Sequence, residues 1–169
     1  LFHNVCDMNV DAYLDPKYGI MDYLKKQKEE GRIRFLGFSI HGDLECTKKF
    51  LDAYGKEMDF CQIQLNWLDY HFQKACDKLE LLKEWNIPVW VMEPLRGGKL
   101  VNMLPKEAEA AMDASGHSWS PAEWGLRWLY NQPEVTVVLS GMNSEAMVLE
   151  NCRTADETQP GSFTEADFA

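Results

Sequence analysis

Three apolar runs of strand-forming residues recur at a nearly constant distance along this chain. They begin at Ile33, Phe60 and Pro88, which lie 27 and 28 residues apart. Each run is followed by a segment whose apolar residues are three or four positions apart, the spacing of one helix face. Strict alternation of buried strands with amphipathic helices predicts a parallel sheet with right-handed crossovers. This recurrence limits the possible folds more than any other feature of the sequence.

The same alternation extends toward both ends of the chain and predicts five strand–helix units. The expected strands cover residues 1–4, 32–39, 59–65, 88–92 and 135–139. The expected helices cover residues 20–31, 44–54, 75–86, 120–130 and 144–154, with shorter helical pieces near 107–112 and 162–165. Residues 5–19 and 66–72 are expected to form loops, and residues 93–119 a long connection. We expect a single domain over residues 1–169.

Composition excludes several classes of partner. Of the 169 residues, 46% are hydrophobic and 26% are charged, which permits a real core. The formal net charge of −10 argues against nucleic-acid binding, because no basic face can neutralise phosphates. No run approaches the length of a membrane span, so no membrane partner is expected. The first residues show no targeting peptide, which favours a cytoplasmic location.

The cysteines favour the same location. There are five of them, an odd number, and no two have the C-x-x-C spacing. Reduced thiols in a cytoplasmic protein fit this usage better than a disulfide framework or a zinc site. We interpret most of them as small buried hydrophobic residues.

The segment Pro88–Leu100 combines a predicted buried strand with a glycine-bearing loop. The loop contains Gly97-Gly98, and Arg96 and Lys99 flank the glycines. α/β proteins place ligands where a parallel strand ends in such a loop. Close backbone approach at glycine and positive charge on both sides suit a phosphate group. The alternative is a surface turn with ordinary solvated charges.

Every other candidate also follows a predicted strand, and in a parallel barrel such positions share one rim. The turn at Ser140–Asn143 leads into a helix whose first N–H groups have no internal partner, so it can hold a phosphate or be an ordinary capped turn. His3 can act as an acid or serve the structure. Gln62 and Asn66 can bind an amide-bearing ligand or the backbone. Glu93 can bind a ligand hydroxyl or pair with Arg96.

Several common motifs are absent from the sequence. It contains neither G-x-G-x-x-G nor G-x-x-x-x-G-K-[ST]. No set of His and Cys residues has the spacing of metal ligands, and no arrangement of Ser, His and Asp residues indicates a catalytic triad. We therefore expect no metal site and no triad-type hydrolase.

Taken together, the segments resemble the C-terminal part of the aldo-keto reductase family. The matching pieces are LFHN (1–4), EEGRIRFLGFS (29–39), DFCQIQLN (59–66), PVWVMEPLRGGKL (88–100), SPAEWGLRWL (120–129) and VTVVLSGMNSEAMVLEN (135–151). Each piece alone is unspecific, but their order and spacing together are specific and cover nearly the whole chain. The segments MEPLRGGKL and LSGMN are similar to the sequences of a bacterial branch of predicted oxidoreductases in that family.

The resemblance implies a fold and a chemistry. The family folds as a parallel (β/α)8 TIM barrel, of which this chain would supply about five βα units, from strand four to helix eight. Its members move hydride between a nicotinamide cofactor, usually NADP, and a small carbonyl or alcohol. A Tyr, a Lys, an Asp and a His serve catalysis. His3 matches the His, and the other three belong to a part of the family's barrel that this sequence does not contain.

The resemblance also implies which residues bind the cofactor. Ser39 and Gln62 match positions that hold the nicotinamide carboxamide. The loop after the seventh barrel strand wraps the pyrophosphate, the loop after the eighth strand lies at the adenosine phosphate, and two residues of the following helix lie near the adenine. These positions are Pro94, Leu95, Arg96, Gly97 and Gly98, then Ser140, Gly141, Met142 and Asn143, then Glu150 and Asn151.

The sequence departs from the family pattern at several of these positions. Ile40 stands where many members have Asn, and Met92 stands where an aromatic ring usually stacks on the nicotinamide. Gly141 and Met147 replace the Lys and Arg that usually hold the 2′-phosphate, which leaves NAD as open as NADP. The cysteine cluster that some members of the branch carry for an iron–sulfur centre is not in this sequence.

Two functions therefore remain open. The first is a segment of an aldo-keto reductase that we expect to be inactive by itself, because the proton-transferring Tyr and Lys are not in it. The second is a non-catalytic cofactor-binding or oligomerising half-barrel. Open strand edges and uncovered apolar faces would let such a module associate with itself or with a missing half.

Overall fold

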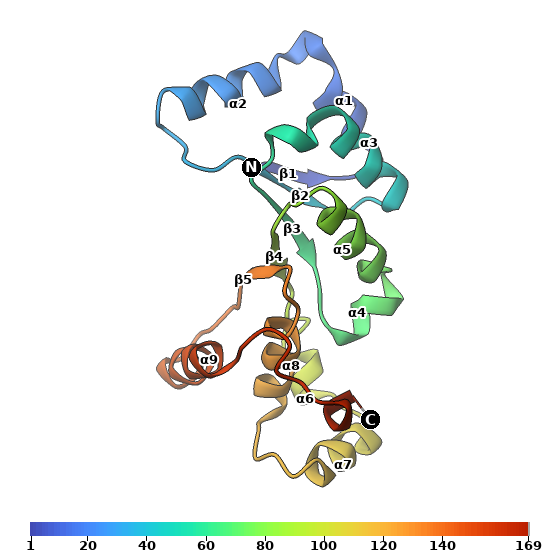
Figure 1. The fold of residues 1–169 in the computed structure, drawn as a ribbon, viewed down its shortest axis with the longest axis vertical. Helices are drawn as coiled ribbons and strands as arrows, with labels where there is room; N and C mark the ends of the chain where they lie inside the picture. Colours follow the sequence, from blue (N-terminus) through green and yellow to red (C-terminus); the bar gives the residue numbers. More distant parts are fainter. Residues whose placement is uncertain (169) are drawn as a thin grey trace. The chain divides into compact units, whose positions relative to one another are not determined.

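Five short strands, each followed by one or more helices, make up the fold (Figure 1). The computed structural model describes residues 1–168. The strands are β1 (Phe2–Val5), β2 (Gly37–Ile40), β3 (Phe60–Gln64), β4 (Val89–Met92) and β5 (Val135–Val138). They form one sheet whose order, β1-β2-β3-β4-β5, is the order of the chain. The predicted α/β alternation with parallel strands is confirmed, as five units of a partial barrel.

The helices occupy the connections between the strands. They are α1 (Val10–Leu14), α2 (Ile20–Glu29), α3 (Leu44–Tyr54), α4 (Trp67–Phe72), α5 (Ala75–Glu84), α6 (Lys99–Asn102), α7 (Lys106–Ala114), α8 (Pro121–Tyr130) and α9 (Glu145–Glu157). Three short 3-10 helices add η1 (Pro16–Tyr18), η2 (Gly55–Glu57) and η3 (Glu165–Phe168). No helix among residues 1–168 has the length and apolar character needed to cross a membrane.

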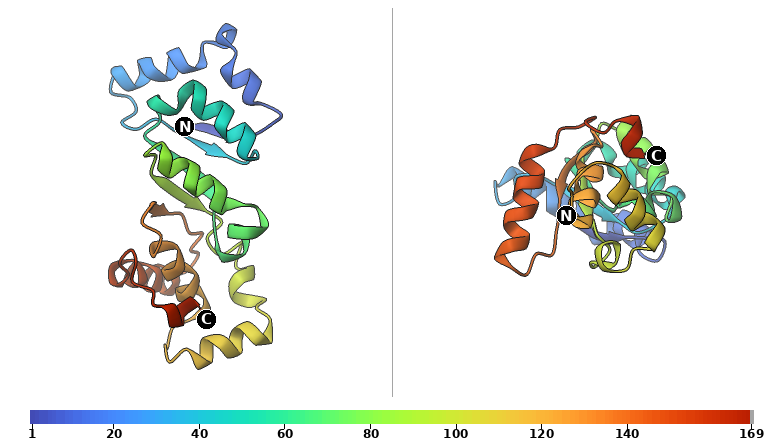
Figure 2. Two further views of the ribbon diagram at one scale, coloured as in Figure 1. Left: turned by 45° about the vertical axis from the view of Figure 1, so that its right-hand side comes forward. Right: turned by 90° about the horizontal axis from the view of Figure 1, so that it is seen from below.

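The described residues divide into two compact units, and each is considered by itself. The first contains residues 1–63 and 74–90. In it β1 pairs with β2 and β2 with β3, both in parallel, with Phe2 opposite Phe38 and Ile40 opposite Ile63. Helices α3 and α5 accompany these strands (Figure 2). The ring of Phe50 packs on Phe2 and Phe38, with centroids 5.2 and 4.6 Å away. This aromatic cluster fixes α3 on the strands.

The second unit contains residues 64–73 and 91–168. The sheet hydrogen bonding continues here, because the Leu65 N–H donates to the Met92 carbonyl at 3.2 Å and the Leu139 N–H donates to the Val91 carbonyl at 2.9 Å. Six of the ten residues of helix α8 are buried, among them the polar pair Glu123–Arg127, with Arg127 Nη2 and Glu123 Oε1 2.7 Å apart. A buried pair of this kind is tolerated because its hydrogen bonds are satisfied.

Local sequence signals explain most of the element boundaries. Asp43 caps α3 by accepting a hydrogen bond from the Cys46 N–H at 2.8 Å, as its position before the apolar stripe predicts. Ser120 caps α8 through the Glu123 N–H at 3.1 Å, and Pro121 is the first helical residue. The cysteines are free, and three of the five, Cys6, Cys46 and Cys61, are buried. Burial raises the pKa of Cys46 to about 11.

Some predicted boundaries are wrong. The strand expected from Arg32 begins only at Gly37, because the N–H groups of Arg32 and Ile33 donate to the Gln27 carbonyl and close α2 instead. Residues 66–72 form the helix α4 rather than a loop. Residues 5–19 contain α1 and η1, the latter started by the Asp15 side chain. Helix α9 continues to Glu157, and the long connection contains α6 as well as a longer α7.

Candidate functional site

Strand β4 ends in a tightly wound loop, Glu93–Gly98. Four of its residues have positive φ: 55° at Glu93, 51° at Arg96, 63° at Gly97 and 81° at Gly98. Left-handed backbone is easy for glycine and costly for other residues, so this conformation needs support from outside the loop. Backbone hydrogen bonds from Arg96 to Glu93, at 3.1 Å, and from Gly98 to Leu95, at 3.0 Å, close two successive turns.

The support comes from a buried polar network at the end of β3. Asp69 is fully buried, and its Oδ2 accepts hydrogen bonds from the side chains of Gln64, at 2.8 Å, and Asn66, at 2.7 Å. The Asn66 side chain also donates to the Glu93 carbonyl at 3.0 Å. Arg96 lies over the network, with its Nε 3.7 Å from the Asp69 carboxylate. The Asp69 carboxylate therefore restrains the loop at two points. It acts on Glu93 through Asn66, and it contacts Arg96 directly.

Strand β5 ends in a loop of another kind. Leu139 and residues 141–149 are exposed, Ser140 is half-buried, and Gly141 has no positive φ. The Ser140 hydroxyl accepts a hydrogen bond from the Asn151 side chain at 3.2 Å, and Ser144 caps α9 through the Met147 N–H at 3.3 Å. The helix that follows has 13 residues, so its aligned peptide dipoles place partial positive charge beside this loop.

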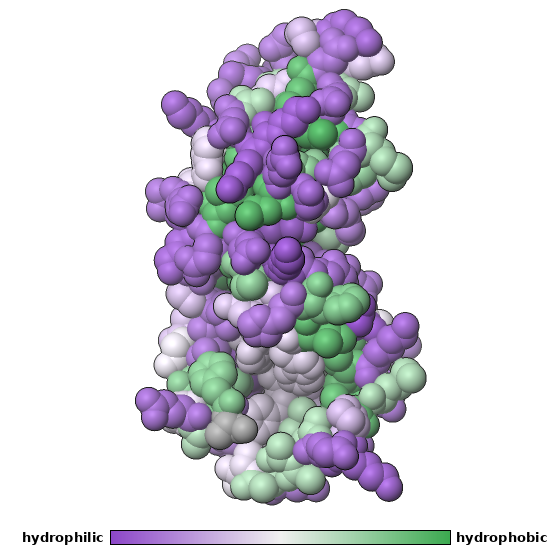
Figure 3. All heavy atoms as spheres, turned by 90° about the vertical axis from the view of Figure 1, so that its right-hand side faces the viewer, coloured by the Kyte–Doolittle hydropathy of each residue, from purple (hydrophilic) through white to green (hydrophobic). Residues whose placement is uncertain are grey.

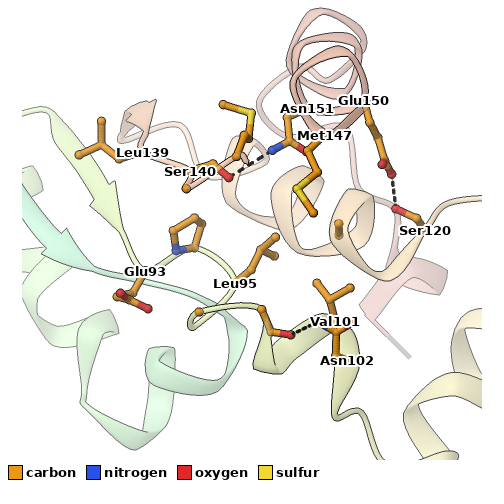
Figure 4. Close-up of a pocket in the computed structure, with 16 residues that line it drawn as sticks. Glu93, Leu95, Val101, Asn102, Ser120, Leu139, Ser140, Met147, Glu150 and Asn151 are labelled. Carbon is orange, nitrogen blue, oxygen red and sulfur yellow. Dashed lines mark hydrogen bonds between the residues drawn. The ribbon is translucent and has the colours of Figure 1, made fainter. Parts of the chain in front are cut away.

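The two loops line one pocket of about 440 Å³ in the second unit (Figure 4). Ala122 and Ser120 at the start of α8 complete its wall. The full lining consists of Glu93, Pro94, Leu95, Gly97, Gly98, Val101, Asn102, Ser120, Ala122, Leu139, Ser140, Gly141, Met142, Met147, Glu150 and Asn151. Across residues 1–168, the backbone N–H groups of Gly97, Gly141 and Met142 donate to no protein acceptor. Both loops therefore contribute lining residues whose backbone N–H groups have no protein acceptor in the described part of the chain.

The charged side chains of the pocket are both acidic. They are Glu93 and Glu150, and no Lys, Arg or His belongs to the lining in the part of the chain that the structure describes. Glu150 Oε1 accepts a hydrogen bond of 2.5 Å from the Ser120 hydroxyl, which holds the carboxylate at one end of the pocket (Figure 4). The lining therefore offers an anion only neutral donors, which are backbone N–H groups and the side chains of Asn and Ser.

Most of the residues predicted for the cofactor come together here. Nine line the pocket: Pro94, Leu95, Gly97, Gly98, Ser140, Gly141, Met142, Glu150 and Asn151. Arg96 and Asn143 do not belong to the lining. Arg96 faces Asp69 instead of Glu93, and it lies 5.5 Å from the centre of the Phe72 ring. The positive charge expected beside the glycines is therefore not directed at the pocket.

The remaining predicted residues, His3, Ser39 and Gln62, belong to the first unit. His3 is exposed, and its backbone carbonyl accepts a hydrogen bond from the Tyr13 hydroxyl at 2.8 Å. Ser39 is fully buried, and its hydroxyl accepts from the Asn4 N–H at 2.7 Å. Burial lowers the pKa of His41 at the end of β2, and the charges of Lys78 and His3 lower it further. The roles of His3, Ser39 and Gln62 stay predictions.

Sequence reasoning missed the roles of Ser120 and Asp69 in the site. Ser120 was expected only as a helix cap, although its hydroxyl also holds Glu150. Asn66 was expected to bind a ligand or the backbone, and its side chain binds the Glu93 carbonyl. Asp69 fell in a stretch interpreted as a loop, although its N–H donates to Asn66 at 2.8 Å and so caps α4. An Asn three residues before an Asp at a strand end is the signal that could have shown this cap. No group of three or more His, Cys, Asp or Glu residues within 1–168 is placed to hold a metal ion.

The sequence profile of the aldo/keto reductase family matches residues 6–161. This match covers most of the chain, and the chain belongs to the aldo/keto reductase family. A search of curated proteins finds no match.

Solved structures of this family share the fold. The aldo-keto reductase AKR11C1 from Bacillus halodurans, in its holo form, is 21% identical with a TM-score of 0.68 over 90% of this chain and 54% of that one. An aldo-keto reductase from Klebsiella pneumoniae in complex with NADPH is 20% identical, with a TM-score of 0.62 over 84% of this chain and 49% of that one. The glycerol dehydrogenase AKR11B4 from Gluconobacter oxydans is 21% identical, with a TM-score of 0.68 over 98% and 54%. The chain spans about half the length of these relatives.

Proposed function

We propose that the pocket binds the diphosphate of a nicotinamide dinucleotide, NADP or NAD. We further propose that the chain is part of an oxidoreductase that moves hydride between this cofactor and a small carbonyl or alcohol. One observation carries the proposal: two loops at the carboxyl ends of β4 and β5 line a single pocket, and both contain lining residues whose backbone N–H groups have no protein acceptor among residues 1–168. Backbone N–H groups and a helix N-terminus are a common way to hold a diphosphate.

The shape of the pocket supports this ligand. Its volume of about 440 Å³ lies within the range of small-molecule sites. Its apolar lining, which includes Leu95, Val101 and Met147, suits the flat face of a base or the edge of a ribose. A relative of the same family was solved with NADPH, which adds weight to a dinucleotide as the ligand class.

The family match guides the assignment of the other residues. We propose that the chain corresponds to strand four through helix eight of the barrel. Ser39 and Gln62 would then hold the nicotinamide carboxamide, and His3 would lie beside the reacting carbonyl. Arg96 and Asn143 would reach the phosphates only after a change of side-chain conformation, because neither lines the pocket. The protein would act in the cytoplasm on a small carbonyl compound.

A titration with NADH tests the binding proposal. We expect Gly97→Asp to weaken binding of NADH by at least tenfold, because it adds a carboxylate where the diphosphate would lie. Gly116→Asp is a matched control: Gly116 also has positive φ, 82°, also has open space around its Cα, and lies outside the pocket. Isothermal titration calorimetry measures both. Equal effects of the two variants, or no binding by the unaltered chain, would contradict the proposal.

Turnover separates binding from catalysis. The proton donor of this family is a Tyr assisted by a Lys, and no residue of this chain matches either. We therefore expect the 169-residue chain to bind the dinucleotide without oxidising NADH or NADPH in the presence of a small aldehyde. Absorbance at the nicotinamide band measures this, and sustained turnover by the chain alone would show that the proposed division of roles is wrong.

A second candidate function, an associating half-barrel, is favoured by one observation. The edge strand β5 has no fully buried residue, whereas every residue of β2 is buried. Leu139 at its end is 43% exposed, and Leu149 on α9 is 64% exposed. An exposed apolar edge strand is a site for pairing with another chain. Light scattering at micromolar concentration tests this, and a monomer at all concentrations would count against it.

A further inference from the structure

We propose that this pocket selects dinucleotides whose adenosine ribose has a free 2′-hydroxyl, so that NAD(H) is preferred over NADP(H), and that Glu150 is the specificity-determining residue. The inference rests on the proposed function, since it concerns the same pocket. It goes beyond that function because it chooses between two cofactors that differ by a single phosphate.

The first argument is the balance of charge in the pocket. A 2′-phosphate is a phosphomonoester with nearly two negative charges, and sites that accept one usually supply Arg or Lys. The lining residues of this pocket supply none within residues 1–168, and they add the carboxylates of Glu93 and Glu150. A 2′-phosphate would therefore be bound without a cation from the lining and in a pocket that already holds two carboxylates.

Among the cations near the lining in sequence, Lys99 is exposed and does not belong to the lining, and two arginines are already engaged. Arg96 lies against the buried carboxylate of Asp69 and the ring of Phe72. Arg153, three residues after Glu150 on α9, has its Nη2 3.5 Å from Glu123 Oε2. Moving either arginine into the pocket would break its present ion pair. Neither arginine is a ready partner for an added phosphate.

The second argument is the hydrogen-bonding state of Glu150. Ser120 donates its only hydroxyl proton to Glu150 Oε1, which fixes the direction of the carboxylate and leaves its other oxygen able to accept. A ribose hydroxyl can donate to that oxygen, and a phosphate oxygen cannot. The same side chain therefore favours the hydroxyl and opposes the phosphate, which is how specificity arises between similar ligands.

The α9 N-terminus does not replace the missing cation. Its cap residue, Ser144, already occupies the Met147 N–H, and Glu145 adds a carboxylate to the first turn. The remaining N–H groups can serve one phosphate group of the diphosphate shared by both cofactors. A 2′-phosphate would have to compete for them.

Parallel titrations of the chain with NADH and NADPH, followed by calorimetry, test the proposal. We expect NADH to bind at least tenfold more tightly. Glu150→Gln should reduce this ratio severalfold, because the amide removes the charge while keeping the shape. Met147→Arg should strengthen binding of NADPH at least tenfold and change binding of NADH little, because position 147 lines the pocket. Val148→Arg is the matched control: it adds the same charge to the same helix at a position that is 41% exposed and outside the lining.

The outcomes separate this inference from the proposed function. Equal or tighter binding of NADPH by the unaltered chain would overturn the inference and leave the dinucleotide site in place. Equal gains from Met147→Arg and Val148→Arg would also overturn it, because the effect would then come from overall charge. Binding of neither dinucleotide would overturn both the site and its selectivity.

Discussion

The two loops that line the pocket are built by different means. The loop after β4 has four residues in the left-handed region and is held by the buried Asn66–Asp69 network. The loop after β5 is exposed except at the half-buried Ser140, and the side chains of Ser140 and Ser144 each make one hydrogen bond that holds it. A ligand therefore meets one wall already in place, and most of the entropy cost of ordering falls on the other.

Among the substitutions that test this difference between the loops, Asp69→Ala should destabilise the protein most. It leaves the buried amide of Asn66 and the half-buried amide of Gln64 without this acceptor, and it removes the partner of Arg96. We expect the free energy of unfolding to fall by about 3 kcal/mol, since each unsatisfied buried group costs about 1–3 kcal/mol and the arginine is partly solvated. Urea denaturation followed by circular dichroism measures this loss.

Asp113→Ala provides the control for that experiment. Asp113 is an exposed residue near the end of α7, and its removal should change the free energy of unfolding by less than about 0.5 kcal/mol. Asp69→Asn should lie between the two variants, because its oxygen can still accept a hydrogen bond. If Asp69→Ala were as mild as Asp113→Ala, the network would not be what holds the β4 loop.

Two glycine-to-alanine changes compare the loops directly. At Gly97 the backbone has φ of 63°, so Gly97→Ala should destabilise the protein by about 1–2 kcal/mol even though the space around the Cα is open. At Gly141 the space is also open and φ is not positive, so Gly141→Ala should change stability by less than about 0.5 kcal/mol. The same denaturation experiment serves both. Equal costs would mean that the two loops do not differ in backbone strain.

Sequence reasoning was strongest where one local signal decides the structure. Ser120-Pro121 fixes the start of α8, and Asp43 fixes the start of α3, because a cap and its helix need no distant partner. The alternation of apolar runs with helix-spaced segments also predicted the parallel sheet, because the type of each element is visible in its own residues. The start of β2 could not be found this way, because Leu36 donates its N–H to the distant Asp59 side chain at 2.6 Å and the strand begins only after it.

In the site, too, the sequence predicted the local features but not the contacts between distant residues. The glycines of the β4 loop and the turn after β5 stand out in the sequence, and the structure places both around one pocket. The direction of Arg96 could not be predicted, because it depends on Asp69, which lies 27 positions earlier on another element. Charge near glycine suggests a phosphate site, but a tertiary partner decides where that charge points.

Binding of a ligand is expected to protect the backbone amides of the two loops from hydrogen exchange to different degrees. Binding of NADH should slow amide hydrogen exchange about fivefold in residues 140–143, because that loop is largely exposed and few hydrogen bonds restrain it before the ligand binds. Exchange in residues 93–98 should change about twofold or less, because the Asn66–Asp69 network already restrains that loop. Hydrogen exchange with mass spectrometry compares the two peptides in one sample. Equal protection of both would remove the distinction between a preformed and an adaptable wall.

The smallest effect is expected at Asn151, whose side chain donates to the Ser140 hydroxyl at 3.2 Å. Asn151→Ala should reduce the free energy of unfolding by about 0.5–1 kcal/mol, the usual net value of one partly solvated hydrogen bond. Its effect on binding of NADH should be larger in proportion, about threefold to fivefold, because the β5 loop would have to be ordered without this contact. Asn102→Ala makes a suitable comparison, since Asn102 also lines the pocket and donates to the Gly98 carbonyl at 3.1 Å, but on the side of the β4 loop. The Asn66–Asp69 network restrains the β4 loop independently, so Asn102→Ala should weaken binding of NADH by less than twofold. If Asn102→Ala weakened binding more than Asn151→Ala, ligand binding would order the β4 loop rather than the β5 loop.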